Sequence, residues 1–212
     1  MLNVNKTPYG VPVYLSKTLV LLSSTLLLAN SAFCDESVPA KNHDNKIIVS
    51  GDSTLHHWTM ESSDLKSELV LTSPVHSVVD LENVQPEKLV VRIPAESLKS
   101  GKGDMDDKAY EALKSDKNPE IIFTLSTLKP IKEKTTATSV SYQAQGDLQI
   151  AGTTKSVSLE ATVTPNEDGS LSVVTGTAID MTEYDMEPPS AMMGMITADE
   201  KVDVKIEGKL AQ

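Results

Sequence analysis

The stretch KVDVKIEGKL, residues 201–210, decides the fold class that this chain is expected to adopt. Val202, Val204 and Ile206 alternate with charged residues, and neighbouring residues of an extended strand point to opposite faces of a sheet. A strand formed by this stretch therefore has one apolar face and one charged face. That pattern is typical of an antiparallel sheet that has its core on one side and water on the other.

The same period of two recurs along the preceding chain. The apolar residues that share a face within one expected strand are Leu65, Leu69 and Leu71; Leu89, Val91 and Ile93; Ile121, Phe123 and Leu125; Tyr142, Ala144, Leu148 and Ile150; Val157, Leu159, Ala161 and Val163; and Leu171, Val173 and Ile179. Turn-forming residues separate the segments, for example at 166–170. Together with residues 46–52, about eight to ten strands are expected. Such strands form a closed barrel or a two-sheet sandwich.

One segment, GDMDDKAYEALKS at 103–115, departs from this pattern. Its apolar residues at helical spacing are Met105, Ala109, Tyr110 and Leu113. Asp104 is a candidate N-cap. The segment predicts one short amphipathic helix between strands, placed where it covers the mouth of a barrel or plugs a groove.

The first 45 residues carry an export signal rather than part of the fold. Residues 18–29, TLVLLSSTLLLA, form an apolar run of signal-peptide length that follows Lys6 and Lys17. We therefore expect a signal peptide at 1–34, a polar linker at 35–45 and one domain at 46–212, located in the periplasm or secreted. Anchoring through a lipid on Cys34 is disfavoured because bulky Phe33 precedes it.

Composition argues against several classes of function. The 30 acidic and 19 basic residues give a net charge of −11 without a basic cluster, which excludes nucleic acid as an expected partner. Cys34 is the only cysteine, so the domain has no disulfide, thiolate metal site or Cys nucleophile. The chain also lacks a Gly-rich phosphate loop, a G-x-S-x-G elbow and an H-E-x-x-H motif. We expect neither an enzyme nor a cofactor.

The stretch SGDSTLHHWTM, residues 50–60, contains two adjacent histidines and the single Trp. In an extended strand His56 shares a face with Trp58 and Met60, while His57 points to the other face. The two imidazoles then bind one metal ion together only if a bulge interrupts the strand. A second metal hypothesis combines His56, Met60 and the methionines of 192–195 as soft ligands for Cu(I). Methionine in a loop is more often an adaptable apolar filler, so core packing or a lid is favoured for these residues over copper, with contact to a lipid ligand as the other alternative.

The chain also resembles a known family of exported proteins. The stretches that carry the resemblance are GDSTLHHWTM, IPAESLKSGKGDMDDKAYEALKSDKNPEIIFTLSTL, GDLQIAGTTKSVSLEATV and ITADEKVDVKIEGKL. Together they resemble the YceI-like family of lipocalin-like barrels over residues 46–210. The resemblance implies an extended antiparallel barrel whose cavity holds a polyisoprenoid, an isoprenoid quinone or a related lipid, without catalysis.

Within such a barrel, alternation assigns a role to each candidate ligand-binding residue. Trp58, Phe123, Tyr142 and Leu148 are expected to line the wall, with Met60 on the face of Trp58. Tyr110, Met192 and Met193 are expected near an opening, and His56 is the candidate for a hydrogen bond to a ligand head group. The chain has only two Phe and one Trp, few bulky side chains to fill a barrel, which favours a cavity.

Two other functions stay open at this level. A Cu(I)-handling module would use the His and Met residues named above, and a structural, stress-protective domain would have a filled interior. An exposed edge strand or a lid is compatible with a homodimer.

Overall fold

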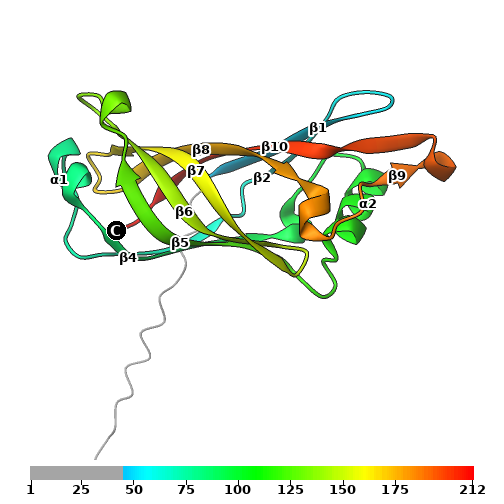
Figure 1. Ribbon diagram of the computed structural model, residues 1–212, viewed down its shortest axis with the longest axis horizontal. Helices are drawn as coiled ribbons and strands as arrows, with labels where there is room; N and C mark the ends of the chain where they lie inside the picture. The colour runs from blue at the N-terminus through cyan, green and yellow to red at the C-terminus, as the bar shows by residue number, and fades with distance from the viewer. Residues whose placement is uncertain (1–44) are drawn as a thin grey trace, which may run out of the picture. The chain divides into compact units, whose positions relative to one another are not determined.

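The alternating segments form one antiparallel sheet that curls into a half-barrel (Figure 1). The computed structural model describes residues 45–212, so the expected signal peptide, Cys34 and all of the expected linker except Asn45 lie outside the described residues. The strands are β1 (Lys46–Ser53), β2 (Trp58–Ser62), β3 (Lys66–Leu71), β4 (Pro86–Pro94), β5 (Glu120–Pro130), β6 (Val140–Ile150), β7 (Thr153–Pro165), β8 (Leu171–Asp180), β9 (Ser190–Ala191) and β10 (Ile196–Leu210). The all-β prediction with eight to ten strands is confirmed.

The strand order is β2-β1-β10-β8-β7-β6-β5-β4-β3, and the short β9 pairs with β10. Strands that follow one another in the sequence mostly pair as hairpins, whereas β1 pairs with β10 over the register Lys46↔Glu207 to Gly51↔Val202. This long-range pairing brings the first strand of the domain beside its last one. The sheet therefore curls far enough to enclose a space on its concave side.

The edge strands of the sheet are β2 and β3, and in the described chain no ladder joins them. Instead, Glu61 of β2 exchanges two backbone hydrogen bonds of 2.8 Å with Lys99, which follows β4. This bridge covers part of the β2 edge, so fewer backbone groups of that edge are left for another chain.

Two α-helices lie at opposite ends of the half-barrel, α1 (Val78–Asn83) and α2 (Gly103–Leu113) (Figure 1). The expected helix is α2, but its N-cap is Lys102 rather than Asp104. Buried Asp106 orders the preceding turn, because its carboxylate accepts hydrogen bonds from the N–H of Ser100 at 2.7 Å and from its hydroxyl at 2.6 Å. None of the described helices has the length and apolar character needed to cross a membrane.

Helix α1 was not expected from the sequence. Its N-cap is Ser77, whose hydroxyl oxygen accepts from the N–H of Asp80 at 3.2 Å. A Ser followed three residues later by an acidic residue is a signal for a helix start that was present in the sequence. Within residues 45–212 there are also four short 3-10 helices: η1 (Ala95–Ser97), η2 (Lys132–Lys134), η3 (Met181–Tyr184) and η4 (Met192–Gly194).

The stretch 50–60 is a hairpin, so its expected single extended strand is wrong. β1 ends at Ser53, and β2 begins at Trp58. The Ser53 hydroxyl donates to the His56 carbonyl at 2.7 Å and accepts from the N–H groups of Leu55 and His56 at 3.3 and 3.1 Å. These local bonds offer the backbone an alternative to the strand ladder, and the chain turns there.

Close packing inside the sheet depends on Gly146 in β6. A Cβ at this position would lie 2.4 Å from the Thr124 carbonyl oxygen and 2.7 Å from the Phe123 ring. We expect Gly146→Ala to lower the free energy of unfolding by about 1–3 kcal/mol in urea denaturation, because backbone and ring must move apart. The matched control is Gly103→Ala at the start of α2, where a Cβ meets nothing within 4 Å. An equal loss in both variants would contradict this packing account.

Candidate functional site

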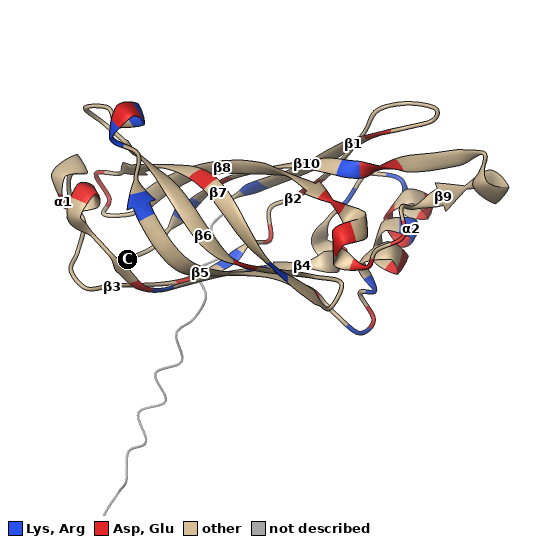
Figure 2. Ribbon diagram, viewed as in Figure 1, with Lys and Arg blue, Asp and Glu red and all other residues tan. Residues whose placement is uncertain are grey.

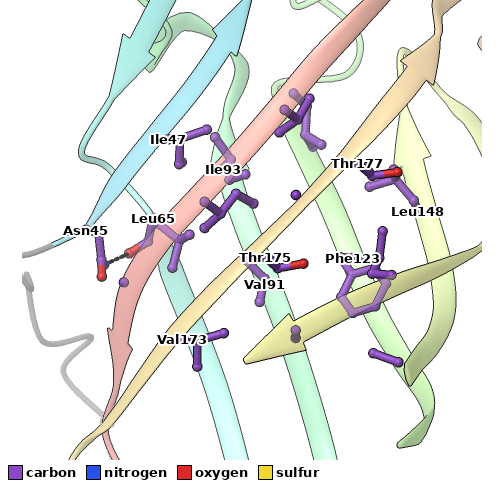
Figure 3. A pocket seen from close by; sticks show the side chains of 18 of the residues that line it. Asn45, Ile47, Leu65, Val91, Ile93, Phe123, Leu148, Val173, Thr175 and Thr177 are labelled. Atoms are coloured by element: carbon purple, nitrogen blue, oxygen red, sulfur yellow. Dashed lines mark hydrogen bonds between the residues drawn. The ribbon is translucent and has the colours of Figure 1, made fainter. Parts of the chain in front are cut away.

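The concave side of the curled sheet encloses a cavity of about 280 Å³. Figure 3 shows side chains from several strands pointing into it, among them Ile47, Val91, Phe123, Leu148 and Val173. Almost every lining group is a hydrocarbon, and α1 and α2 add apolar side chains at the two ends. The cavity is therefore an apolar interior rather than a polar cleft.

Strand alternation produces this wall. In β10 the lining residues Val202, Val204, Ile206, Gly208 and Leu210 form the face that the period of two selects, and Lys209 also lines the cavity. In β5 the register with β6 shifts between Leu125 and Thr127, so that both Leu125 and Leu128 line the cavity. The bulge inserts one residue and thereby turns the next apolar side chain inward.

The few polar side chains in the wall have partners within the protein. Asn45 is 4% exposed, accepts from the N–H of Lys209 at 3.0 Å and donates to the Leu65 carbonyl at 3.3 Å. Thr175 donates to the Glu160 carbonyl at 2.8 Å, and Thr177 to its neighbour Ala178 at 3.3 Å. In the described chain no buried side-chain nitrogen or oxygen lacks a partner. A ligand consequently meets hydrocarbon and already satisfied polar groups.

Trp58 lines the cavity beside the hairpin turn. Its ring packs on the backbone of Gly51, where a Cβ would lie 2.6 Å from the ring. Its Nε1–H donates to the Asp52 carbonyl at 3.1 Å. The ring thus offers its apolar surface to the interior while its polar edge is satisfied, as is usual for a partly buried Trp.

Five of the nine predicted ligand-binding residues lie together in the wall: Trp58, Met60, Phe123, Tyr142 and Leu148. Their contact with a ligand stays a prediction. The sequence did not single out Thr175 and Thr177, which occupy inward positions of β8 despite being polar. Their place in the alternation between Val173 and Ile179 was the available signal.

The remaining four candidates do not line the cavity. His56 is exposed in the turn 54–57, so its predicted place on the face of Trp58 is wrong. The Tyr110 hydroxyl accepts from Lys99 Nζ at 2.6 Å and donates to the Leu98 carbonyl at 2.7 Å. Ala109, Ala112 and Leu113 present the inward face of α2 instead.

Met192 and Met193 are exposed at the turn between β9 and β10 and do not line the cavity. Met186 and Pro189, which precede β9, lie in the wall in their place. A loop composition rich in Met suggested burial, whereas the left-handed backbone at Met192 and Met193 forms a protruding turn.

The methionines that were candidate ligands for Cu(I) lie in different environments. Met60 is 3% exposed inside the cavity wall, whereas Met192, Met193 and Met195 are exposed. His57 Nδ1 lies 3.1 Å from Asp52 Oδ1 at the surface. Within residues 45–212 no group of three or more His, Cys, Asp or Glu residues is arranged to hold a metal ion.

Burial raises the pKa of Tyr142 to about 12, with a smaller contribution from the charge of Glu82. The folded pKa lies above the ordinary value of 10.0, so the stability from the neutral phenol is complete below pH 10 and is lost as pH rises towards 12. In urea denaturation across this range, the free energy of unfolding should fall by about 2–3 kcal/mol more for the wild type than for Tyr142→Phe. Parallel pH profiles would contradict this assignment.

Comparisons with known proteins support the fold and its family. The family model of the YceI-like domain matches residues 49–210. The crystal structure of BcnA from Burkholderia cenocepacia superposes with a TM-score of 0.61 at 12% identity, covering 79% of this chain and 96% of that chain. A search among curated proteins finds no match.

Two further solved structures show the same fold. A polyisoprenoid binding domain from Saccharophagus degradans, implicated in plant cell wall breakdown, has a TM-score of 0.59 at 11% identity, covering 81% of this chain and 96% of that one. The YceI protein of Campylobacter jejuni has a TM-score of 0.52 at 15% identity, covering 91% and 99%. At these identities the likeness concerns the fold alone.

Proposed function

The chain belongs to the YceI-like domain family, and on that premise we propose that it binds a long apolar ligand, a polyisoprenoid, an isoprenoid quinone or a related lipid. It would carry or store this ligand in the cell envelope without catalysis. The observation that carries the proposal is the cavity of about 280 Å³ with a wall of hydrocarbon side chains.

Burial of the ligand's chain supplies the binding free energy. Each CH₂ group transferred from water to such a wall contributes ~0.8 kcal/mol. The cavity far exceeds the roughly 30 Å³ that one water molecule occupies in the liquid. It compares with the smaller ligand pockets of proteins, which begin near ~300 Å³. An apolar chain fits these properties better than a polar metabolite, for which the wall offers few free hydrogen-bonding groups.

The solved neighbour from Saccharophagus degradans supports the same class of ligand, because it is described as a polyisoprenoid binding domain. None of the lining residues is His, Cys, Asp or Glu, which favours binding over catalysis. His, Asp and Glu are the most frequent general acids and bases, and Cys is a common nucleophile. A location in the periplasm or outside the cell is supported by the apolar run 18–29.

Mass spectrometry of an organic extract from the purified protein tests the proposal. We expect a long-chain isoprenoid or related lipid in amounts approaching one per protein. Trp58 offers an independent measurement, because it is the single Trp and lines the cavity. An isoprenoid quinone added to the delipidated protein should quench its fluorescence, and an isoprenoid alcohol should compete. A protein that is empty as purified and shows no saturable quenching would overturn the proposal.

The alternative functions fit the structure less well. A purely structural domain is expected to fill its interior, whereas this one encloses a cavity. A Cu(I) module requires His and Met around one ion, but Met60 lies in the cavity wall and the 192–195 methionines are exposed. Metal analysis after anaerobic copper loading distinguishes the copper module from a lipid-binding protein.

A further inference from the structure

Exposed apolar side chains gather on two loops at the α2 end of the half-barrel (Figure 1). Leu55 lies in the β1–β2 turn, and Met192, Met193 and Met195 lie in the β9–β10 turn. Their exposed fractions are 67%, 64%, 106% and 69%. These four, here called the apolar tip, are four of the seven large apolar residues that are exposed in the described chain. Single exposed apolar residues scattered over a surface are normal, whereas a cluster of them marks an interaction site.

Hydrogen bonds join the two loops of the apolar tip. The Thr54 N–H donates to the Thr197 carbonyl at 3.0 Å. The Thr54 hydroxyl donates to the Met195 carbonyl at 3.2 Å and accepts from the Thr197 N–H at 3.2 Å. The loops therefore form one connected surface, and its side chains are presented by an ordered backbone.

The backbone of the second loop holds its methionines outward. Met192, Met193 and Gly194 have φ values of 50°, 57° and 85°, three successive residues in the left-handed region. Methionine rarely adopts this conformation, and such strain is concentrated at functional segments of proteins. This left-handed backbone forms a turn in which the Met193 side chain is fully exposed to solvent.

Charge is absent from both loops. Residues 53–60 and 188–198 contain no Asp, Glu, Lys or Arg, although these residues make up 23% of the chain. The residues that flank the loops are acidic: Asp52, Glu187, Asp199 and Glu200. Figure 2 shows both turns in tan, beyond the blue and red parts of β10 and α2. The partner of this surface is therefore apolar at the point of contact and is not strongly anionic around it.

We propose that the apolar tip docks the protein onto a lipid bilayer of zwitterionic head groups, with its four side chains inserted among them. A specific protein interface buries about 1,200 Å² or more, which four side chains on protruding turns do not supply alone. A bilayer surrounds a protruding side chain on every side and accepts it without a matching pocket. The acidic flanks disfavour a surface rich in anionic lipid.

Docking would bring the bilayer next to the cavity. Trp58 and Pro189 line the cavity, and each adjoins one loop of the tip in the sequence. Passage of a lipid between bilayer and cavity at this end rests on the proposed function, whereas docking itself does not.

Flotation with phosphatidylcholine vesicles tests the proposal. The purified protein should float with the vesicles, and the variant Leu55→Ser/Met192→Ser/Met193→Ser/Met195→Ser should bind at least about tenfold more weakly. The matched control is Val79→Ser on α1, at the opposite end, where Val79 is 66% exposed. This control should bind like the wild type. The wild type, the serine variant and Val79→Ser share the same N-terminal residues. A difference in their vesicle binding therefore reports on the substituted side chains.

Two further experiments vary the charge of the lipid and measure self-association of the protein. Adding phosphatidylglycerol should weaken binding, and added salt should restore it, because the repulsion of the acidic flanks is screened. As a second measurement, Met193→Trp in a Trp58→Phe background should show blue-shifted emission on vesicles. Unchanged binding of the serine variant would overturn the proposal. A tip that only joins two copies of the protein would also overturn it. In that case the wild type would be a dimer in light scattering, the serine variant would be a monomer, and neither protein would bind vesicles.

Vesicle binding tests the docking proposal and lipid extraction tests the proposed function, so a negative result in one leaves the other standing. A protein that contains lipid but ignores vesicles contradicts docking and leaves the proposed function intact. A protein that floats but is empty and unquenched contradicts the proposed function alone.

Discussion

Ala161→Phe is expected to reduce the lipid recovered from the purified protein at least about tenfold, which from near-full occupancy requires binding to weaken by more than the 1.4 kcal/mol of a tenfold change in affinity. Ala161 lines the cavity on β7. It pairs with Tyr142 of β6 and Thr175 of β8, whose side chains point to the same side of the sheet. A phenyl ring at this position fills space that the ligand needs. Mass spectrometry of the organic extract, normalised to protein, measures the loss.

Ser156→Phe is the matched control on the same strand. Ser156 is exposed and does not line the cavity, so the same ring added there should leave lipid content unchanged. Circular dichroism melts of both variants test whether the sheet has formed. Undiminished lipid in a folded Ala161→Phe protein would place the ligand outside this cavity.

Tyr142→Ala is expected to lower the free energy of unfolding by about 3–5 kcal/mol, a larger loss than that of Gly146→Ala. Tyr142 is 1% exposed in the packed end of the interior near α1. Its hydroxyl donates to the Leu81 carbonyl at 2.6 Å and so joins β6 to α1. The substitution removes both the ring and this bond. Urea denaturation at neutral pH measures the effect.

Tyr142→Phe separates the two contributions. It keeps the ring and leaves the Leu81 carbonyl without its donor, for an expected cost of about 1–3 kcal/mol. If the alanine variant loses no more stability than the phenylalanine variant, the ring is not part of the packed core.

The inward face of each long strand could be predicted because it depends only on the order of residues. Phe123, Leu148, Ala161 and Val204 were placed by alternation, and all four line the cavity. Alternation failed at His56, because the Ser53 hydroxyl forms local hydrogen bonds that replace the strand. Apolar and polar spacing contains no information about such a turn.

Helix α2 shows the same division between what could and could not be predicted. A helix within 103–115 followed from the spacing of its apolar residues, but the spacing could not decide which side faced the interior. Leu113 and the small residues Ala109 and Ala112 occupy that side, and Tyr110 bonds to the Leu98 carbonyl. The path of the chain between β4 and β5 determines this rotation.

The sequence alone determined an antiparallel β domain, the inward faces of its long strands and the membership in the YceI-like family, because periodicity and short motifs are local properties. Only the tertiary structure decided that β1 pairs with β10, that Thr54 bonds to the loop of Met195, and that the space between the faces is left open. The first two features join residues about 140 positions or more apart. Such distant contacts depend on how the whole sheet curls, a property that no short stretch of sequence contains.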